Sequence, residues 1–217
     1  MVSEGSKTSQ DSNEIAPLPS EDGRASPRKK TVRKRKKARP LDETSLRDLA
    51  LAYVARFATT GAKLEGYLLR KLRERGVVED EDGRIQTPDL GALVAQLIEL
   101  GYVDDEAYAR SKTRDLTARG YGARRVEQAL WAAGVNEHTR EETAPSEADT
   151  RRAAIMLAKK RRFGPFGIAP EDDEPADQSH KRREKQVAAM LRAGHKFEHI
   201  AFILDAQEIG EIDEWLI

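Results

Sequence analysis

The chain has 217 residues, of which 35% are charged and 6% are aromatic, and it contains no cysteine. This composition favours helices over a large β core, and it excludes a disulfide framework and a cysteine-ligated zinc site. No apolar run approaches the ~20 residues of a membrane span, and no apolar signal segment follows the start. The sequence therefore predicts a cytoplasmic protein that does not bind membranes.

The predicted tail, residues 1–40, has two parts. Residues 1–27 are polar, with almost nothing to bury, and are expected to be disordered. Segment 28–39, RKKTVRKRKKAR, holds nine basic residues and no acid, although the whole chain has zero net charge. This segment is either a solubilising arm or an arm that contacts nucleic acid weakly and without base specificity. Its basic residues are Arg28, Lys29, Lys30, Arg33, Lys34, Arg35, Lys36, Lys37 and Arg39.

The first repeat is expected over residues 41–103, as three amphipathic helices. An apolar stripe runs from Leu46 to Phe57 and predicts a helix capped by Thr44 or Ser45. The sequence Thr-Thr-Gly at 59–61 is expected to end it.

Two further stripes, over 64–72 and 90–98, predict the second and third helices of this repeat. Gly76 and Gly101 are placed to end them, since glycine readily adopts the left-handed backbone that closes a helix. Before the third helix, Thr-Pro-Asp at 87–89 predicts an N-cap, a proline at the first helical position and an acid in the first turn.

The stretch LGYVDDEAYAR, 100–110, is interpreted as a joint between repeats. Gly101 ends one helix, Tyr102 and Val103 fold back on it, and Asp104 or Asp105 caps the next. We expect this joint to set the angle between the first two repeats. The residues assigned to structural joints along the chain are Gly76, Gly101, Tyr102, Asp105, Tyr108 and Gly134.

The pattern then recurs. The phrase L-x-x-x-L-x-x-x-G-V at 68–77 returns, with valine first, at 126–135, a separation of 58 residues. A second repeat is predicted over 104–145, and a truncated form of it is expected because NEHTREETAP at 136–145 has no apolar stripe.

A third repeat is predicted over 146–207, starting at the capping-box-like Ser146-x-x-Asp149. An acidic linker over 164–179, in which GPFG is expected to be a turn, interrupts it. The acidic and apolar tail, 208–217, either packs back or serves as a docking peptide. The predicted fold class is all-α, with tandem three-helix repeats forming an elongated, curved body.

Two stretches carry a resemblance to a known family. The joint L-x-x-L-G-Y-V-D-D-x-x-Y-A at 97–109, followed by A-R-G-Y-G-A-R-R-V-E-Q-A-L-x-x-x-G-V at 118–135, resembles the RecX regulatory proteins of bacteria. The likeness extends over residues 46–204. The matching positions are Leu97, Gly101, Tyr102, Asp105, Tyr108, Ala109, Gly120, Arg125, Val126, Leu130, Gly134 and Val135, with Lys71, Leu72 and Gly76 in the first repeat.

The resemblance implies a non-enzymatic regulator without a cofactor. Such proteins bind the RecA recombinase filament on DNA and inhibit its ATP hydrolysis, strand exchange and coprotease function. They thereby modulate recombination, DNA repair and the SOS response. A monomer that docks through many weak polar contacts is expected.

Basic residues beside the joints are the candidates for partner binding. They cluster at equivalent places in three repeats, although any single charge is more often just part of a solvated helix face. The candidates are Lys63, Arg70, Lys71 and Arg73 in the first repeat, Arg110, Arg114, Arg119, Arg124 and Arg125 in the second, and Lys159, Lys160, Arg161 and Arg162 in the third.

Two alternatives remain. His195 and His199 have a spacing that can bind metal on a helix, but an ordinary helix surface is the preferred interpretation. No catalytic triad and no phosphate-binding loop is present. The alternative function is a direct DNA-binding protein, in which the helices around Gly120 act as a helix-turn-helix and the basic arm assists.

Overall fold

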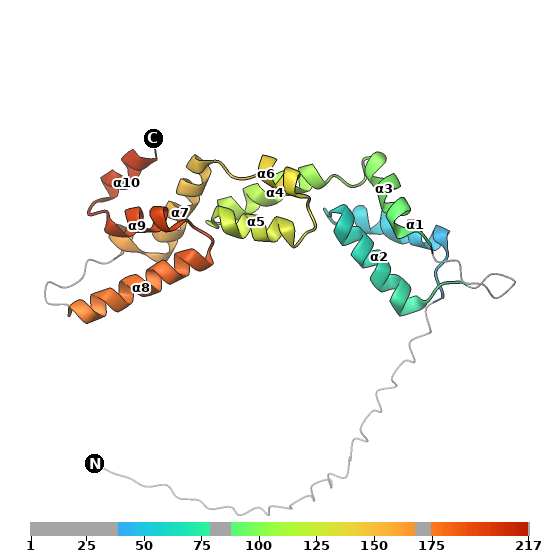
Figure 1. Ribbon diagram of the computed structural model, residues 1–217, viewed down its shortest axis with the longest axis horizontal. Helices are drawn as coiled ribbons and strands as arrows, with labels where there is room; N and C mark the ends of the chain where they lie inside the picture. Colours follow the sequence, from blue (N-terminus) through green and yellow to red (C-terminus); the bar gives the residue numbers. More distant parts are fainter. Residues whose placement is uncertain (1–38, 79–87, 168–174, 217) are drawn as a thin grey trace, which may run out of the picture. The chain divides into compact units, whose positions relative to one another are not determined.

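The computed structural model describes residues 39–78, 88–167 and 175–216. Most of these residues are helical, and they hold no strand beyond one isolated bridge that pairs Leu41 with Val77 (Figure 1). The all-α repeat class predicted from the sequence is confirmed. In chain order the helices are α1 (Glu43–Val54), α2 (Gly61–Arg75), α3 (Leu90–Glu99), α4 (Asp105–Ala118), α5 (Ala123–Trp131), α6 (Glu137–Glu142), α7 (Glu147–Arg161), the 3-10 helix η1 (Gly164–Phe166), α8 (Ala176–Arg192), α9 (Phe197–Asp205) and α10 (Ile209–Trp215).

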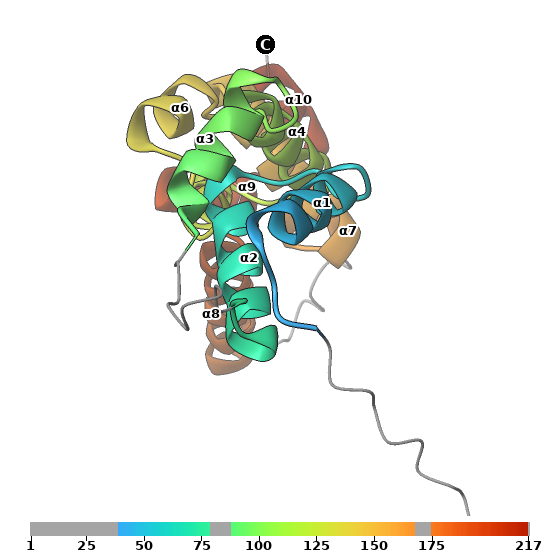
Figure 2. The same ribbon diagram turned by 90° about the vertical axis from the view of Figure 1, so that its right-hand side faces the viewer.

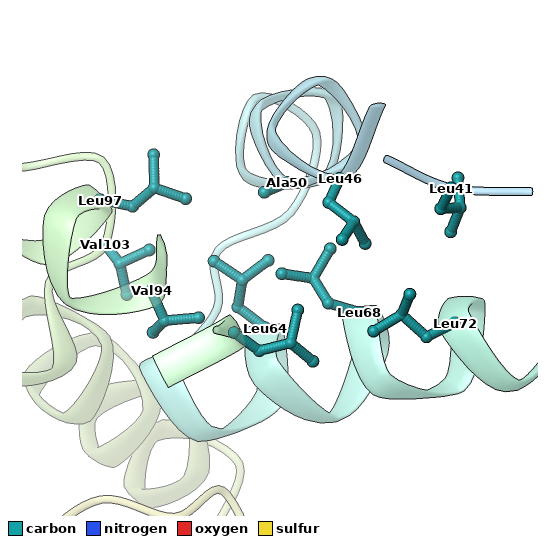
Figure 3. Close-up of a cluster of buried hydrophobic side chains, with 10 residues drawn as sticks. Leu41, Leu46, Ala50, Leu64, Leu68, Leu72, Val94, Leu97 and Val103 are labelled. Atoms are coloured by element: carbon teal, nitrogen blue, oxygen red, sulfur yellow. The ribbon is translucent and has the colours of Figure 1, made fainter. Parts of the chain in front are cut away.

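The helices α1, α2 and α3 enclose the first of three apolar cores, and Figure 2 shows these three helices from the right-hand side of Figure 1. Leu46 of α1, Leu64 and Leu68 of α2, and Leu97 of α3 are fully buried in it and point toward one another (Figure 3). Leu41 seals the end of this core through two backbone hydrogen bonds, to Gly76 and from Val78. Segment 41–103 thus has a core of its own.

The other two cores are smaller and follow in chain order. The second is built around Leu116 of α4 and Val126 and Leu130 of α5. The third gathers residues from four segments and includes Ile155 of α7 and Ile212 of α10. Each core draws on helices close in sequence, as expected for tandem repeats. The exact repeat boundaries stay predictions.

Several helix ends differ from the sequence expectation. Asp42, not Thr44 or Ser45, caps α1, and its carboxylate accepts a hydrogen bond from the Ser45 amide at 2.7 Å. Asp, Ser and Thr are all good caps, so propensity could not choose among them. α1 ends at Val54, before residues 59–61.

The starts of α2 and α3 also differ from the sequence expectation. Thr60 begins α2 instead of ending α1, because its hydroxyl accepts the Lys63 amide. Asp89 caps α3 by accepting the Ala92 amide at 2.9 Å, so Pro88 precedes the helix instead of opening it. The residue Thr87 lies outside the described residues.

Segment 136–145, which has no apolar stripe, still forms the short helix α6. Asn136 caps it, and Arg140 holds it to the second repeat by donating to the Val135 carbonyl and to the Glu127 carboxylate, both at 2.7 Å. Polar contacts therefore replace the missing stripe. The predicted turn at GPFG is the 3-10 helix η1.

The predicted disordered tail and basic arm, residues 1–38, and part of the acidic linker, residues 168–174, lie outside the described residues. Of the arm, only Arg39 is described, and it is exposed. Among the described helices, none is long and apolar enough to cross a membrane.

Candidate partner-binding surface at the repeat joints

The first joint connects the start of α2 with the second repeat. The Thr60 hydroxyl donates a hydrogen bond to the Ala133 carbonyl at 2.5 Å, and the Gly61 amide donates to the Asp105 carboxylate at 2.9 Å. Next to them, a Cβ at Gly134 would collide with the Ala62 methyl group. Asp105 and Gly134, both predicted joint residues, are therefore brought together at this joint by the fold.

The second joint connects the start of α5 with the end of α8. The Gly122 amide donates to the Ala193 carbonyl at 2.9 Å, and the Arg124 amide donates to the Gly194 carbonyl at 3.2 Å. Added Cβ atoms would clash here, since one at Gly122 would fall 2.6 Å from the His195 nitrogen. The backbone at the start of α5 and the backbone at the end of α8 therefore approach each other closely at this joint.

The two joints share one geometry. In each, the residue before the middle helix of one repeat (Thr60 or Gly122) bonds the carbonyl of an alanine just after the middle helix of the next repeat (Ala133 or Ala193). Helix C-termini leave carbonyls unpaired, and the donor that satisfies the alanine carbonyl is the Thr60 hydroxyl at the first joint and the Gly122 amide at the second. The recurrence is strong support for treating these segments as equivalent repeats.

The remaining predicted joint residues act more locally. Gly101 has φ +75° and Gly76 has φ +78°, and both have open space where a side chain would stand. Tyr102 is exposed. Tyr108 lies at the first joint, where Lys63 contacts its hydroxyl and stands 4.5 Å from its ring centre. None of the described hydrogen bonds across the two joints involves Gly76, Gly101 or Tyr102.

Among the candidate cations of the first repeat, most already have a partner. Lys63 is held by Tyr108 as described above. Arg70 and Lys71 pair with Glu74, at 4.0 and 2.6 Å, and flank the Tyr67 ring. Arg73 is exposed and makes no ion pair with the described residues.

In the second repeat, Arg110 pairs with Glu106, and Arg119 lies 3.5 Å from Asp115. The three others are exposed and have no ion pair within the described part of the chain. These unpaired cations are Arg114, Arg124 and Arg125. Arg124 and Arg125 also lie at the second joint, which they contact through their backbone.

In the third repeat, Lys159, Lys160, Arg161 and Arg162 lie exposed at the end of α7. Lys159 stands over the Phe166 ring, 5.3 Å from its centre. Arg162 has the left-handed backbone that closes the helix, φ 55°. Cations near a helix C-terminus interact favourably with its dipole, which is a structural reason for this cluster. Their role in binding a partner stays a prediction.

The interpretation of His195 and His199 as an ordinary helix surface was wrong, because both side chains are buried, at 5% and 3% exposure. His195 precedes α9 and bonds the Gly120 carbonyl at 3.0 Å. Burial lowers the pKa of His195, against the opposing effect of that hydrogen bond, and His199 lowers it further. The described residues contain no group of three His, Cys, Asp or Glu that could hold a metal ion.

His199 belongs to a polar cluster that the sequence analysis missed. Its Nε2 lies 2.6 Å from the Glu147 carboxylate, which also accepts from Lys196 at 3.0 Å. Hydrogen bonds from Lys196 and His199 lower the pKa of Glu147 to about 2. Arg151 extends the cluster by donating to the Trp215 carbonyl at 3.0 Å. The cluster thus ties α7, α9 and α10 together.

Comparison with known proteins supports the same picture. Residues 104–143 match the family model described as RecX, second three-helix domain. Regulatory protein RecX of Myxococcus xanthus is 31% identical over 189 residues, which are 86% of this chain and 98% of that protein. Regulatory protein RecX of Thermus thermophilus is 35% identical over 113 residues, 52% of this chain and 71% of that protein.

Among solved structures, RecX from Lactobacillus salivarius superposes with a TM-score of 0.54 and 19% identity, covering 79% of this chain and 96% of that one. At that identity the likeness shows the fold. The fold and its joints define a protein of tandem three-helix repeats. With the full-length similarity above, the chain belongs to the RecX family of regulatory proteins. This family is named for regulation and not for a catalysed reaction.

Proposed function

We propose that this chain binds the RecA recombinase filament on DNA and inhibits its ATP hydrolysis, strand exchange and coprotease activity. It would act as a cytoplasmic, monomeric, non-enzymatic regulator that modulates recombination, DNA repair and the SOS response. The observation that carries this proposal is the similarity to a regulatory protein RecX over 86% of the chain and 98% of the relative.

The charge distribution supports docking on a large partner. Arg114, Arg124 and Arg125 are exposed and unpaired within the described part of the chain. A single exposed ion pair contributes only about 0–1 kcal/mol, so useful affinity requires several at once. Repeats held by defined joints keep such charges at fixed places, whereas a flexible chain would lose free energy in ordering them.

The direct test is RecA's ATP hydrolysis on single-stranded DNA while this protein is titrated in. We expect the rate to fall at less than one copy per RecA subunit, without binding of the protein to free DNA at the same concentration. A variant lacking residues 1–39 should inhibit to a similar degree.

A specific feature favours the alternative of direct DNA binding, namely the nine basic residues of segment 28–39. If ATP hydrolysis is unaffected and the full chain binds bare DNA with a steep salt dependence that the truncated variant lacks, the filament proposal fails. The chain would then be a DNA-binding protein that uses this arm.

A further inference from the structure

Two short segments of the first repeat share one sequence pattern. Residues 53–57, YVARF, and residues 67–71, YLLRK, each place an arginine three residues after a tyrosine, followed by phenylalanine or lysine. Side chains spaced by three and four residues lie on one face of a helix. Segment 67–71 lies within α2, and segment 53–57 continues past the end of α1, where the Phe57 amide donates to the Tyr53 carbonyl at 3.0 Å. Each segment thus presents an aromatic ring and a cation on one side.

The rings of these segments form a row across α1 and α2, which pack against each other (Figure 1). The Tyr53 and Tyr67 rings are stacked, with their centres 4.3 Å apart, and the centre of the Phe57 ring lies 5.2 Å from that of Tyr53. Packing against the first core accounts for Tyr53 and Tyr67, which are half-buried. Phe57 lies outside that core and is 51% exposed. The row therefore ends in a ring that is open to a ligand.

Three cations stand beside this row of rings. Arg56 lies 5.7 Å from the centre of the Phe57 ring. Arg70 and Lys71 lie 5.5 and 5.9 Å from the centre of the tyrosine ring of α2, within the range of a cation–π interaction. Glu74 pairs with Arg70 and Lys71, whereas Arg56 makes no ion pair within the described residues. Three cations and the one acid that pairs with them leave a positive excess beside the rings.

Rings and cations side by side match the chemistry of a single-stranded nucleic acid. Each nucleotide carries a flat base, which stacks on an aromatic ring or a guanidinium plane, and a phosphate, which a neighbouring cation attracts. An acidic peptide would use the cations but bring no flat partner for each ring. A duplex offers its phosphates, but its bases are already paired and stacked on one another. Of these occupants, a single strand uses both features of the surface.

We propose that this surface of α1 and α2 binds single-stranded DNA, with a base stacked on Phe57 and the adjacent phosphates near Arg56 and Arg70. Only the choice of DNA over RNA rests on the proposed function, because the RecA filament contains DNA. A site for one or two bases binds weakly by itself. It is therefore compatible with a chain that does not bind free DNA at the concentrations that inhibit RecA.

The test measures binding of full-length variants to a labelled oligo(dT) of about 15 nucleotides, and to a duplex of the same length, by fluorescence anisotropy. Raised salt weakens the phosphate contacts of segment 28–39 and leaves stacking largely in place. Phe57→Ala removes the exposed ring, and Phe57→Trp keeps an aromatic surface. Phe197→Ala is the matched control, since Phe197 is 62% exposed at the start of α9 and no cation stands over its ring within the described residues.

We expect Phe57→Ala to weaken binding of oligo(dT) on the order of tenfold, with Phe57→Trp and Phe197→Ala within about twofold of wild type. Binding to the duplex should be equal for all four proteins. If Phe57→Ala binds oligo(dT) as Phe197→Ala does, or loses the duplex equally, no base stacks at this ring and the inference is overturned. Tighter binding of oligo(rU) than of oligo(dT) would overturn the choice of DNA.

A second measurement locates the contact in the wild-type protein and needs no variant. An oligo(dT) that carries iodouracil crosslinks under ultraviolet light to aromatic side chains stacked on it, and mass spectrometry identifies the crosslinked residue. We expect crosslinks at Phe57 or Tyr67, and crosslinks confined to other residues would overturn the inference. Neither measurement contains RecA, so failure of the proposed function appears separately, in the ATP hydrolysis assay, and leaves the stacking site standing.

Discussion

The Gly122 amide lies 2.9 Å from the Ala193 carbonyl, which places the N-terminus of α5 directly against the C-terminal turn of α8. The approach is possible because Gly122 and Gly194 both lack a side chain. Gly122 has φ −79°, a conformation that any residue adopts, so space and not backbone strain requires glycine there.

Replacing Gly122 with alanine should therefore destabilise the protein. The added Cβ would meet the Gly194 carbonyl and lie 2.6 Å from the His195 nitrogen, both backbone atoms that cannot rotate away. We expect a loss of about 1–3 kcal/mol in the free energy of unfolding, as for other overpacked sites. Chemical denaturation followed by circular dichroism measures it.

The matched control is Gly66→Ala. Gly66 lies within α2, is exposed, and has nothing within 4 Å of an added Cβ. Alanine should stabilise that helix by about 0.5–1 kcal/mol. Equal stability of Gly122→Ala and Gly66→Ala would show that the close approach at the second joint is absent in solution.

The C-terminal helix offers a second prediction. Ile212 of α10 is 0% exposed in the third core, while Ile209 of the same helix is 46% exposed. We expect Ile212→Ala to cost about 2–5 kcal/mol and Ile209→Ala less than about 0.5 kcal/mol. Thermal unfolding of both variants distinguishes them. Deletion of 208–217 without loss of thermal stability would contradict the packing role and favour a docking peptide.

The third prediction concerns the pH dependence of stability. The pKa of buried His195 is lowered in the folded protein, whereas the unfolded chain takes up a proton near the ordinary value of about 6.5. Below that pH the unfolded state binds more protons, so stability is present above about 6.5 and falls on acidification. The slope is at most about 1.4 kcal/mol per pH unit for this one group.

Thermal unfolding of His195→Gln between pH 7.5 and 5.5 tests this. The glutamine amide can still donate to the Gly120 carbonyl but does not titrate, so the melting temperature should depend less on pH than in wild type. His138→Gln is the control, since the His138 side chain is 79% exposed. The same pH dependence in wild type and His195→Gln would disprove the assignment.

The fourth prediction returns to Gly101. At φ +75° a valine costs about 1–2 kcal/mol of strain, although nothing stands within 4 Å of its Cβ. Asparagine tolerates this conformation better. If Gly101 sets the angle between the first two repeats, Gly101→Val should weaken the proposed inhibition of RecA and Gly101→Asn should largely retain it. Unchanged inhibition by a folded Gly101→Val protein would refute that role.

The positions of helices and of their glycine ends were predictable from the sequence, because both depend on residues that are neighbours in the chain. The apolar stripes predicted the longer helices but not α6, and Gly76, Gly101 and Gly134 were correctly expected at helix ends, where all three have positive φ. Caps were less predictable. Asp42 and Thr60 have neighbours with equal capping propensity, and only the folded backbone decides between them.

Long-range contacts could not be derived in this way. The spacing of His195 and His199 says nothing about burial, which comes from packing against Gly120 and Glu147, 75 and 52 residues away. The glycines at 120 and 122 were a usable signal, because a residue without a side chain lets backbone segments approach closely. Their partner at Gly194 is set by tertiary structure alone.

The two joints differ in how mutation reaches them. The first uses the Thr60 hydroxyl and the Asp105 carboxylate, which a truncation to alanine removes. The second uses peptide groups at Gly122, Arg124, Ala193 and Gly194, which truncation of a side chain leaves in place. Side-chain truncation would thus reveal the first joint and miss the second. Only insertions of bulk or of proline would reveal that the array has two.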